Sequence, residues 1–283
     1  MTSISSADLV GKRTGPVEHR VDARWVMAYA AGIDDLSDAY FDNRDGKPLG
    51  IHPVFPVCLE WPVLVASMAE HGVDMRRSVH ATHDLHLVAP LVADETYMTT
   101  ATIVGAEQRK PGVYLGWRFD TSDSAGRVVC QTWQGNLFLG ATLVGEALWT
   151  EPLAPLPGFA TKAGVPRSCD LLVPRNMAHV YTECARIWNP IHTDRAVATA
   201  NGIGDPLLHG TATLALAVSA LVSRVLEGDA TRVRRITARF AGRVELPNAL
   251  TLEYSRCGTA GVCFSMRTAD GQTALRDGHF IYI

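Results

Sequence analysis

The stretch Gly210-Thr-Ala-Thr-Leu-Ala-Leu-Ala-Val-Ser-Ala-Leu-Val222 decides the fold of this chain. It predicts a helix, extended to Leu226, that is apolar on nearly all sides, and such a helix is buried over most of its surface. Only strand-like segments follow it, separated by turns such as Asp270-Gly271. Helices followed by antiparallel strands predict an α+β fold, in which a sheet wraps around the buried helix.

The first half of the chain repeats this order of elements. Each half predicts a short helix, a polar turn, a Pro-containing segment, an apolar helix and four strands. Tyr40 aligns with His192 at a shift of 152 residues, and Pro53 aligns with Pro206 at a shift of 153. One repeat of about half the chain predicts a duplicated fold rather than a solenoid, whose repeats span about 20–50 residues. The predicted strands are 78–88, 96–106, 112–121, 127–139, 233–244, 249–256, 262–268 and 274–283.

A Pro-rich segment between the halves predicts a linker. It begins Glu151-Pro-Leu-Ala-Pro-Leu-Pro-Gly158 and continues with small and turn-forming residues. We therefore predict two repeats, residues 1–150 and residues 167–283, joined by a linker over residues 151–166.

Composition favours a cytoplasmic protein that binds neither nucleic acid nor membrane. The net charge is −3 among 283 residues, and residues 1–13 lack the apolar core of a signal peptide. The apolar stretch that ends at Val222 is too short to cross a bilayer. Six cysteines are spread singly without a CxxC pair, as is usual in a reducing compartment. His80, His83 and His86 alternate along a predicted strand, so we expect neither a metal nor a cofactor.

The candidate chemistry lies in Asn189-Pro190-Ile191-His192-Thr193-Asp194 and in Asp205-Pro206-Leu207-Leu208-His209-Gly210. His192 can take up or give a proton near neutral pH. Asp194 is predicted to cap the helix over residues 195–201. Together the segments place an imidazole, an amide and the start of an apolar helix close together, which suits proton transfer on a substrate held at a helix N-terminus.

These two segments resemble the MaoC-like (R)-specific enoyl-CoA hydratases, also called hydratase 2. The family motif runs Ser-Gly-Asp-x-Asn-Pro-[aliphatic]-His-x-Asp, and a later Pro-aliphatic-aliphatic-His-Gly step opens the central helix. The second half fits at Asn189, His192, Asp194 and residues 206–210. The resemblance implies a hotdog fold, an antiparallel sheet around a central helix, and the repeat extends it to a double hotdog.

The resemblance also implies an activity. The family adds water to a trans-2-enoyl thioester of CoA or an acyl carrier protein, giving an (R)-3-hydroxyacyl thioester, or catalyses the reverse. His192 would act as base or acid, Asn189 would hold the water or the thioester, and the N–H of Gly210 would meet the thioester oxygen. The first half would supply pocket walls and support. We also expect that two chains can associate as a homodimer.

One departure from the family pattern concerns the second acid–base group. Ile187 stands at the position of the family's aspartate and Arg186 at that of its glycine. The repeat-equivalent position in the first half is Asp35, but Tyr40 replaces the histidine there. Three alternatives follow: another residue supplies the acid, His192 with Asn189 handles one proton with water as partner, or the site binds a thioester or another substrate without hydrating it. The residues considered as the replacement acid are Glu183, Asp205, His209, Asp35 and Glu60.

Each candidate residue can also have a purely structural role. His192 can be a buried structural histidine, Asn189 can brace its own turn, and Gly210 can serve close packing. His209, Ile187, Trp188, Arg186 and Tyr40 are predicted to shape the pocket or its rim. The functions that remain open are a hydratase or dehydratase, a thioester-binding protein, an isomerase or cyclase of secondary metabolism, and a thioesterase.

Overall fold

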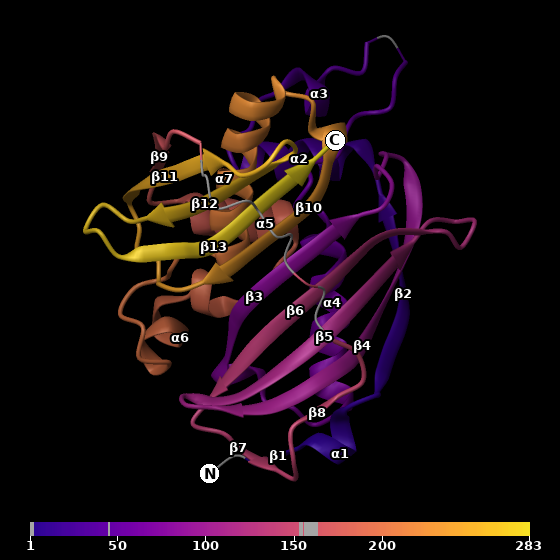
Figure 1. Ribbon diagram of the computed structural model, residues 1–283, viewed down its shortest axis with the longest axis vertical. Coiled ribbons are helices and arrows are strands. Elements are labelled where there is room, and N and C mark those ends of the chain that lie inside the picture. Colours follow the sequence, from indigo (N-terminus) through magenta and orange to yellow (C-terminus); the bar gives the residue numbers. More distant parts are fainter. Residues whose placement is uncertain (1–2, 45, 153–154, 156–163) are drawn as a thin grey trace.

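The computed structural model describes residues 3–44, 46–152, 155 and 164–283. An antiparallel sheet dominates the structure, and helices lie behind it in the view of Figure 1. The order along the sheet is β2-β4-β5-β6-β3-β10-β13-β12-β11-β9, with the short β8 paired to β4. The strands are β2 Arg13–Val21, β3 Ser78–Leu87, β4 Glu95–Arg109, β5 Gly112–Ser122, β6 Val128–Leu139, β8 Leu148–Trp149, β9 Arg167–Val173, β10 Val233–Phe240, β11 Asn248–Arg256, β12 Gly261–Arg267 and β13 Thr273–Tyr282.

The strand order is symmetric about the pair β3 and β10. Reading outward from this seam gives β3-β6-β5-β4-β2 on one side and β10-β13-β12-β11-β9 on the other. The seam itself is antiparallel, with Arg235 opposite His86 and Thr237 opposite Asp84. The predicted duplication is therefore confirmed, and the two repeats share one continuous sheet (Figure 1).

Each repeat has a long apolar helix against its part of the sheet. In the second half α7 (Gly210–Leu226) buries Leu214, Val218 and Leu221 completely, as the all-round apolar pattern predicts. In the first half α4 (Pro56–Glu70) begins with a proline at its first position, where no backbone N–H is needed. The remaining helices are α1 Ser6–Leu9, α2 Ala23–Gly32, α3 Asp38–Phe41, α5 Met177–Ala185 and α6 Arg195–Ala200, with 3-10 turns η1 Met75–Arg77, η2 Pro190–His192 and η3 Ala230–Arg232.

The sequence pattern missed the first strand of each repeat and one strand end. Strands β2 and β9 are the two edges of the sheet, where polar residues and proline are tolerated, so neither segment reads as a strand. The small parallel pair β1 (Ser3–Ser5) and β7 (Thr142–Val144) was missed as well. The strand predicted to reach Val244 ends at Phe240, because Val244 instead bonds to Leu208 ahead of α7. Most of the predicted linker lies outside the described residues.

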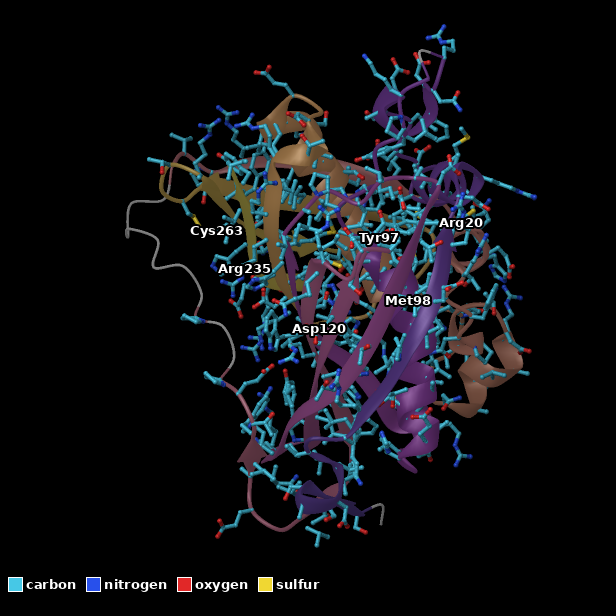
Figure 2. The ribbon with its side chains drawn as sticks, turned by 90° about the vertical axis from the view of Figure 1, so that its right-hand side faces the viewer. Arg20, Tyr97, Met98, Asp120, Arg235 and Cys263 are labelled. Atoms are coloured by element: carbon cyan, nitrogen blue, oxygen red, sulfur yellow. A yellow bond between two sulfur atoms is a disulfide. The ribbon has the colours of Figure 1, made fainter. Side chains whose placement is uncertain are left out.

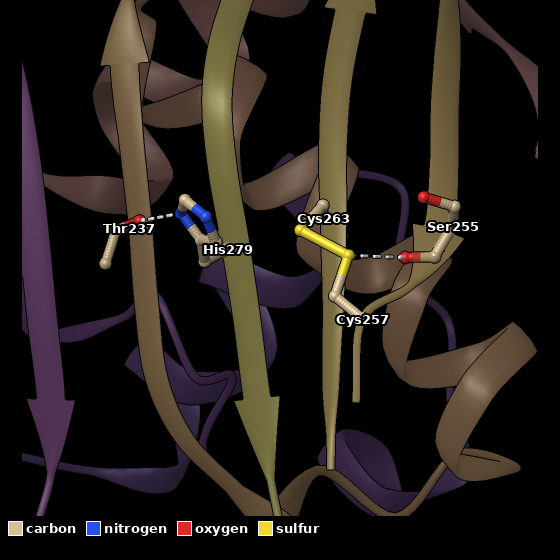
Figure 3. The surroundings of a disulfide bond; sticks show 5 residues. All are labelled: Thr237, Ser255, Cys257, Cys263 and His279. Carbon is tan, nitrogen blue, oxygen red and sulfur yellow. Dashed lines mark hydrogen bonds between the residues drawn. A yellow bond between two sulfur atoms is a disulfide. The ribbon is translucent and has the colours of Figure 1, made fainter. Parts of the chain in front are cut away.

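Cys257 and Cys263 form a disulfide between β12 and the end of β11 (Figure 3). The expectation that the cysteines stand singly is wrong for this pair. Strand register brings them together, since Ser255 lies opposite Cys263, and spacing in the sequence does not reveal that contact. Among the helices in the described ranges, none is long and apolar enough to cross a membrane.

Candidate active site

A cavity of about 310 Å³ is lined by residues from both repeats. From the second half come the turn around His192, the segment 207–211 and Ile187. From the first half comes one side of α4, together with residues of β3 and β6. The volume is at the small end of the range for ligand pockets, about 300–1,000 Å³. The imidazole of His192 therefore lines a cavity rather than a sealed core.

The turn η2 holds His192 in a defined tautomer. Asn189 precedes the turn and accepts a hydrogen bond from the N–H of Ile191 at 3.4 Å, while Pro190 occupies the first position. Nδ1 of His192 lies 2.9 Å from the carbonyl oxygen of Leu207. A carbonyl oxygen can only accept, so Nδ1 carries the proton and Nε2 keeps its lone pair. The Nε2 atom is thus the available base.

His209 stacks against His192, with ring centroids 3.7 Å apart. Its Nε2 atom lies 3.2 Å from the hydroxyl oxygen of Thr182, whose own proton goes to the carbonyl of Ala178. His209 therefore donates to Thr182. Burial, and then the charge of His192, hold the pKa of His209 well below its usual value, so it stays neutral beside its partner.

Burial lowers the pKa of His192 from 6.5 to about 4, and the bond to the Leu207 carbonyl only partly opposes this. We therefore expect kcat/KM to stay constant from about pH 8 down to about pH 5.5 and to fall as pH approaches about 4, because a general base must be unprotonated. A pH profile with circular dichroism at each pH checks this. A fall centred near pH 6.5 in folded protein would contradict it.

The same shift links His192 to folding stability. Its folded pKa lies below the unfolded value of about 6.5. The unfolded chain therefore binds the proton more readily between these two values. The contribution of the neutral ring is fully present above pH 6.5 and is lost as pH falls through about 4.

The N-terminus of α7 supplies the other half of the site. Its cap residue, His209, makes no side-chain bond to the first turn. By contrast, Asp194 caps α6 as predicted, accepting from the N–H groups of Ala196 and Val197. A Cβ added to Gly210 would lie 2.9 Å from the ring of Phe240, so the glycine is required for packing. Gly210 lines the cavity, and an uncapped helix N-terminus attracts negative charge.

Ile187 is buried and lines the cavity where the family pattern has its aspartate. Among the described residues, no Asp or Glu lines this cavity. Glu183 accepts from Trp188, Asp205 pairs with Arg195, and Asp35 accepts from the N–H of Ser37. Glu60 is buried and accepts from Thr132. Of the five candidate replacements, only His209 contacts the cavity.

Three predicted pocket residues are placed elsewhere. Arg186 has a left-handed backbone at the end of α5 and lies over the ring of Trp25 at 3.9 Å, outside the cavity lining. Trp188 is 59% exposed and is also outside the lining. Tyr40 lines a separate cavity of about 200 Å³ near the start of α4. This second cavity also takes walls from both repeats, because Gly228, Asp229 and Val233 of the second half line it as well.

Sequence reasoning predicted that the first half supplies pocket walls but named none of the residues in this wall. Its lining residues on α4, β3 and β6 are Val57, Trp61, Leu64, Met68, Ser78, Val79, His80, Gln134, Asn136 and Leu139. They carry no local motif and come together only through packing. The spacing of the four on α4 was a usable signal, since they mark one helix face.

Comparison with known families decides the relationship. Residues 160–275 match the family described as MaoC like domain. The second half is a MaoC-like domain. Residues 8–132 match the FAS1-like, dehydratase domain region, so the two matches together account for both repeats. The resemblance inferred from the motif around His192 is confirmed.

Two named proteins are similar to this chain over most of its length. It is 26% identical to the 3-hydroxyacyl-thioester dehydratase Y of Mycobacterium tuberculosis, covering 97% of both chains. It is 22% identical to the peroxisomal multifunctional enzyme type 2 of Drosophila melanogaster, over 84% of this chain but only 42% of that enzyme. The chain thus spans less than half of that relative.

Solved structures confirm the fold. A MaoC-like dehydratase from Phytophthora capsici superposes with a TM-score of 0.85 at 19% identity, covering 99% of this chain and 98% of the other. A Mycobacterium tuberculosis protein described as having a double hotdog fold gives 0.66 at 16% identity, covering 96% and 95%. The chain is an α+β double hotdog, as predicted.

Proposed function

We propose that this chain is a hydro-lyase that adds water to a trans-2-enoyl thioester of CoA or an acyl carrier protein, or removes it from the 3-hydroxyacyl thioester. The observation that carries this proposal is the neutral His192, whose Nε2 lone pair faces a cavity that also contains the uncapped N-terminus of α7. The name of the relative 3-hydroxyacyl-thioester dehydratase Y supports the same reaction class.

His192 alone can move both protons. Nε2 takes a proton from water as the water oxygen bonds to C3, and the displaced electron pair moves through C2 to the thioester oxygen. The N–H of Gly210 and the helix dipole stabilise that charge. The imidazolium then returns its proton to C2, which completes the addition of one water. The lowered pKa of His192 makes the ring a weak base in the first step and a strong acid in the second.

Asn189 has a bracing role and a free donor. Its Oδ1 accepts from the N–H of Ile191, so the side-chain oxygen braces the turn of Asn189. The Nδ2 group has no hydrogen-bond partner within the described residues, and Asn189 lines the cavity. We assign this amide the role of orienting the attacking water: its N–H donates a hydrogen bond to a lone pair of the water oxygen.

A second candidate function rests on Ile187. Because no carboxyl group among the described residues lines the cavity, the site also suits thioester binding, or an isomerisation or cyclisation that needs only one proton-transfer group. A thioesterase is a third, weaker candidate, which release of free thiol would reveal. The carrier, the cytoplasmic location and a homodimer stay predictions.

The substitution Ile187→Asp separates the first two functions. If the native site completes hydration with His192, we expect kcat for enoyl thioesters to change by less than about tenfold, against the 10²–10⁴ that a needed acid–base group supplies. Ile187→Asn is the matched control, since it has the same size without the ionisable group. A gain of about 100-fold in the Asp variant alone would show that the native site is tuned for another reaction.

A further inference from the structure

We propose that the natural acyl group carries an oxygen, as a hydroxyl or keto group away from the thioester, and that Ser78, Gln134 and Asn136 bind it. The inference rests on the proposed function for the thioester end and names the substrate class more closely. It follows from two walls of the cavity that the first half contributes and that differ in polarity.

One wall of the cavity is a stripe along α4. Val57, Trp61, Leu64 and Met68 are spaced by four, three and four residues and all line the cavity. This spacing places them on one face of the helix. From Val57 to Met68 the stripe extends about 16 Å at 1.5 Å per residue. The cavity therefore follows the helix for about three turns, which suits an extended acyl chain.

The opposite wall, from β3 and β6, contains Val79 and Leu139 but also a group of polar side chains. Gln134 and Asn136 alternate with outward residues on β6, and both are buried. The amide of Gln134 donates to Asn136 at 2.8 Å, and the amide of Asn136 donates to the hydroxyl of Ser78 on β3 at 2.7 Å. All three line the cavity. Together they form a polar row on the sheet face that looks toward α4.

The polar row keeps hydrogen-bonding groups unused by the protein. Each amide has a second proton, and the oxygen of Gln134 has no hydrogen-bond partner within the described residues. The matching strand β13 of the other repeat buries the apolar side chains Leu275 and Phe280. A plain alkyl chain would strip water from these groups and leave them unpaired, whereas a hydroxyl or keto oxygen would pair with them.

The test measures binding of unreactive ligands to the full chain by calorimetry. The probes are octanoyl-CoA and analogues with one hydroxyl, placed at successive carbons from the middle of the chain to its end. We expect one analogue to bind at least about tenfold more tightly than octanoyl-CoA, the equivalent of one good hydrogen bond. Asn136→Leu and, separately, Gln134→Leu remove polar groups at nearly constant volume and should abolish that preference.

Gln131→Leu, the same kind of substitution on β6 but outside the cavity lining, is the matched control and should leave the preference unchanged. Thermal melting checks that each variant is folded. The inference is overturned if no hydroxylated analogue binds more tightly than octanoyl-CoA, or if the preference survives in both Asn136→Leu and Gln134→Leu. A hydroxyl preference without hydration of any enoyl thioester would end the proposed function and leave this inference standing. Hydration of an enoyl thioester without a hydroxyl preference would overturn this inference and leave the proposed function standing.

Discussion

Replacing His192 with alanine should lower kcat for hydration of an enoyl thioester by about 10²–10⁴, because the variant loses the only side chain assigned to proton transfer. The KM should change less, since the walls of the cavity remain. Steady-state rates of the purified variant with the best thioester of the wild-type protein check this expectation.

The control for this variant is Trp188→Phe. Trp188 lies on the same turn but is largely exposed and outside the cavity, so its variant should retain the rate of the wild-type protein. If His192→Ala keeps more than about a tenth of the activity while folded, the ring is structural, and His209, the other imidazole in the cavity, becomes the candidate.

The substitution Arg235→Ala should cost about 3–5 kcal/mol of unfolding free energy, because it leaves a largely buried carboxylate without its cationic arginine partner and with only His86 beside it. Arg235 lies on β10 at the seam (Figure 2). It makes two bonds to Asp84 of β3, at 2.8 and 2.7 Å. Burial pushes the pKa of Asp84 upward, but hydrogen bonds from His86 and Arg235 outweigh it, so the net pKa is lowered and the carboxyl stays charged.

Urea unfolding at neutral pH measures this loss, and the same strand offers a control. Arg239 pairs with Asp277 at 3.6 Å, but both side chains are about half exposed. Arg239→Ala should therefore cost no more than about 1 kcal/mol. The double variant Asp84→Leu/Arg235→Leu should recover much of the loss, because it removes both charges together. Equal stability of Arg235→Ala and Arg239→Ala would contradict the importance of the seam pair.

The parts of the fold that sequence predicts are those set by local periodicity. The apolar pattern of residues 210–226 gave α7 because burial on all sides needs no knowledge of its neighbours. The edge strands β2 and β9 lack such a pattern. Each pairs with a neighbouring strand on one side only, so apolar and polar residues do not alternate regularly along it. The Cys257–Cys263 bond depends on strand register in the same way.

The same distinction between local pattern and tertiary packing applies to the residues of the site. His192 and Gly210 were predictable because a short segment contains each with its neighbours. The α4 stripe and the polar row of Ser78, Gln134 and Asn136 come from the other repeat, so only the folded chain brings them to the cavity. Two residues predicted for the pocket or its rim lie outside this cavity. Tyr40 lines the second cavity, and Arg186 lies over the ring of Trp25.

Product analysis tests the central claim most directly. The purified chain is incubated with trans-2-enoyl thioesters of CoA and of acyl carrier protein, in plain and oxygenated series of graded length, and the products are resolved by mass spectrometry. The account predicts a 3-hydroxyacyl thioester, heavier by one water, from at least one of them. Recovery of every substrate unchanged by folded protein would contradict it.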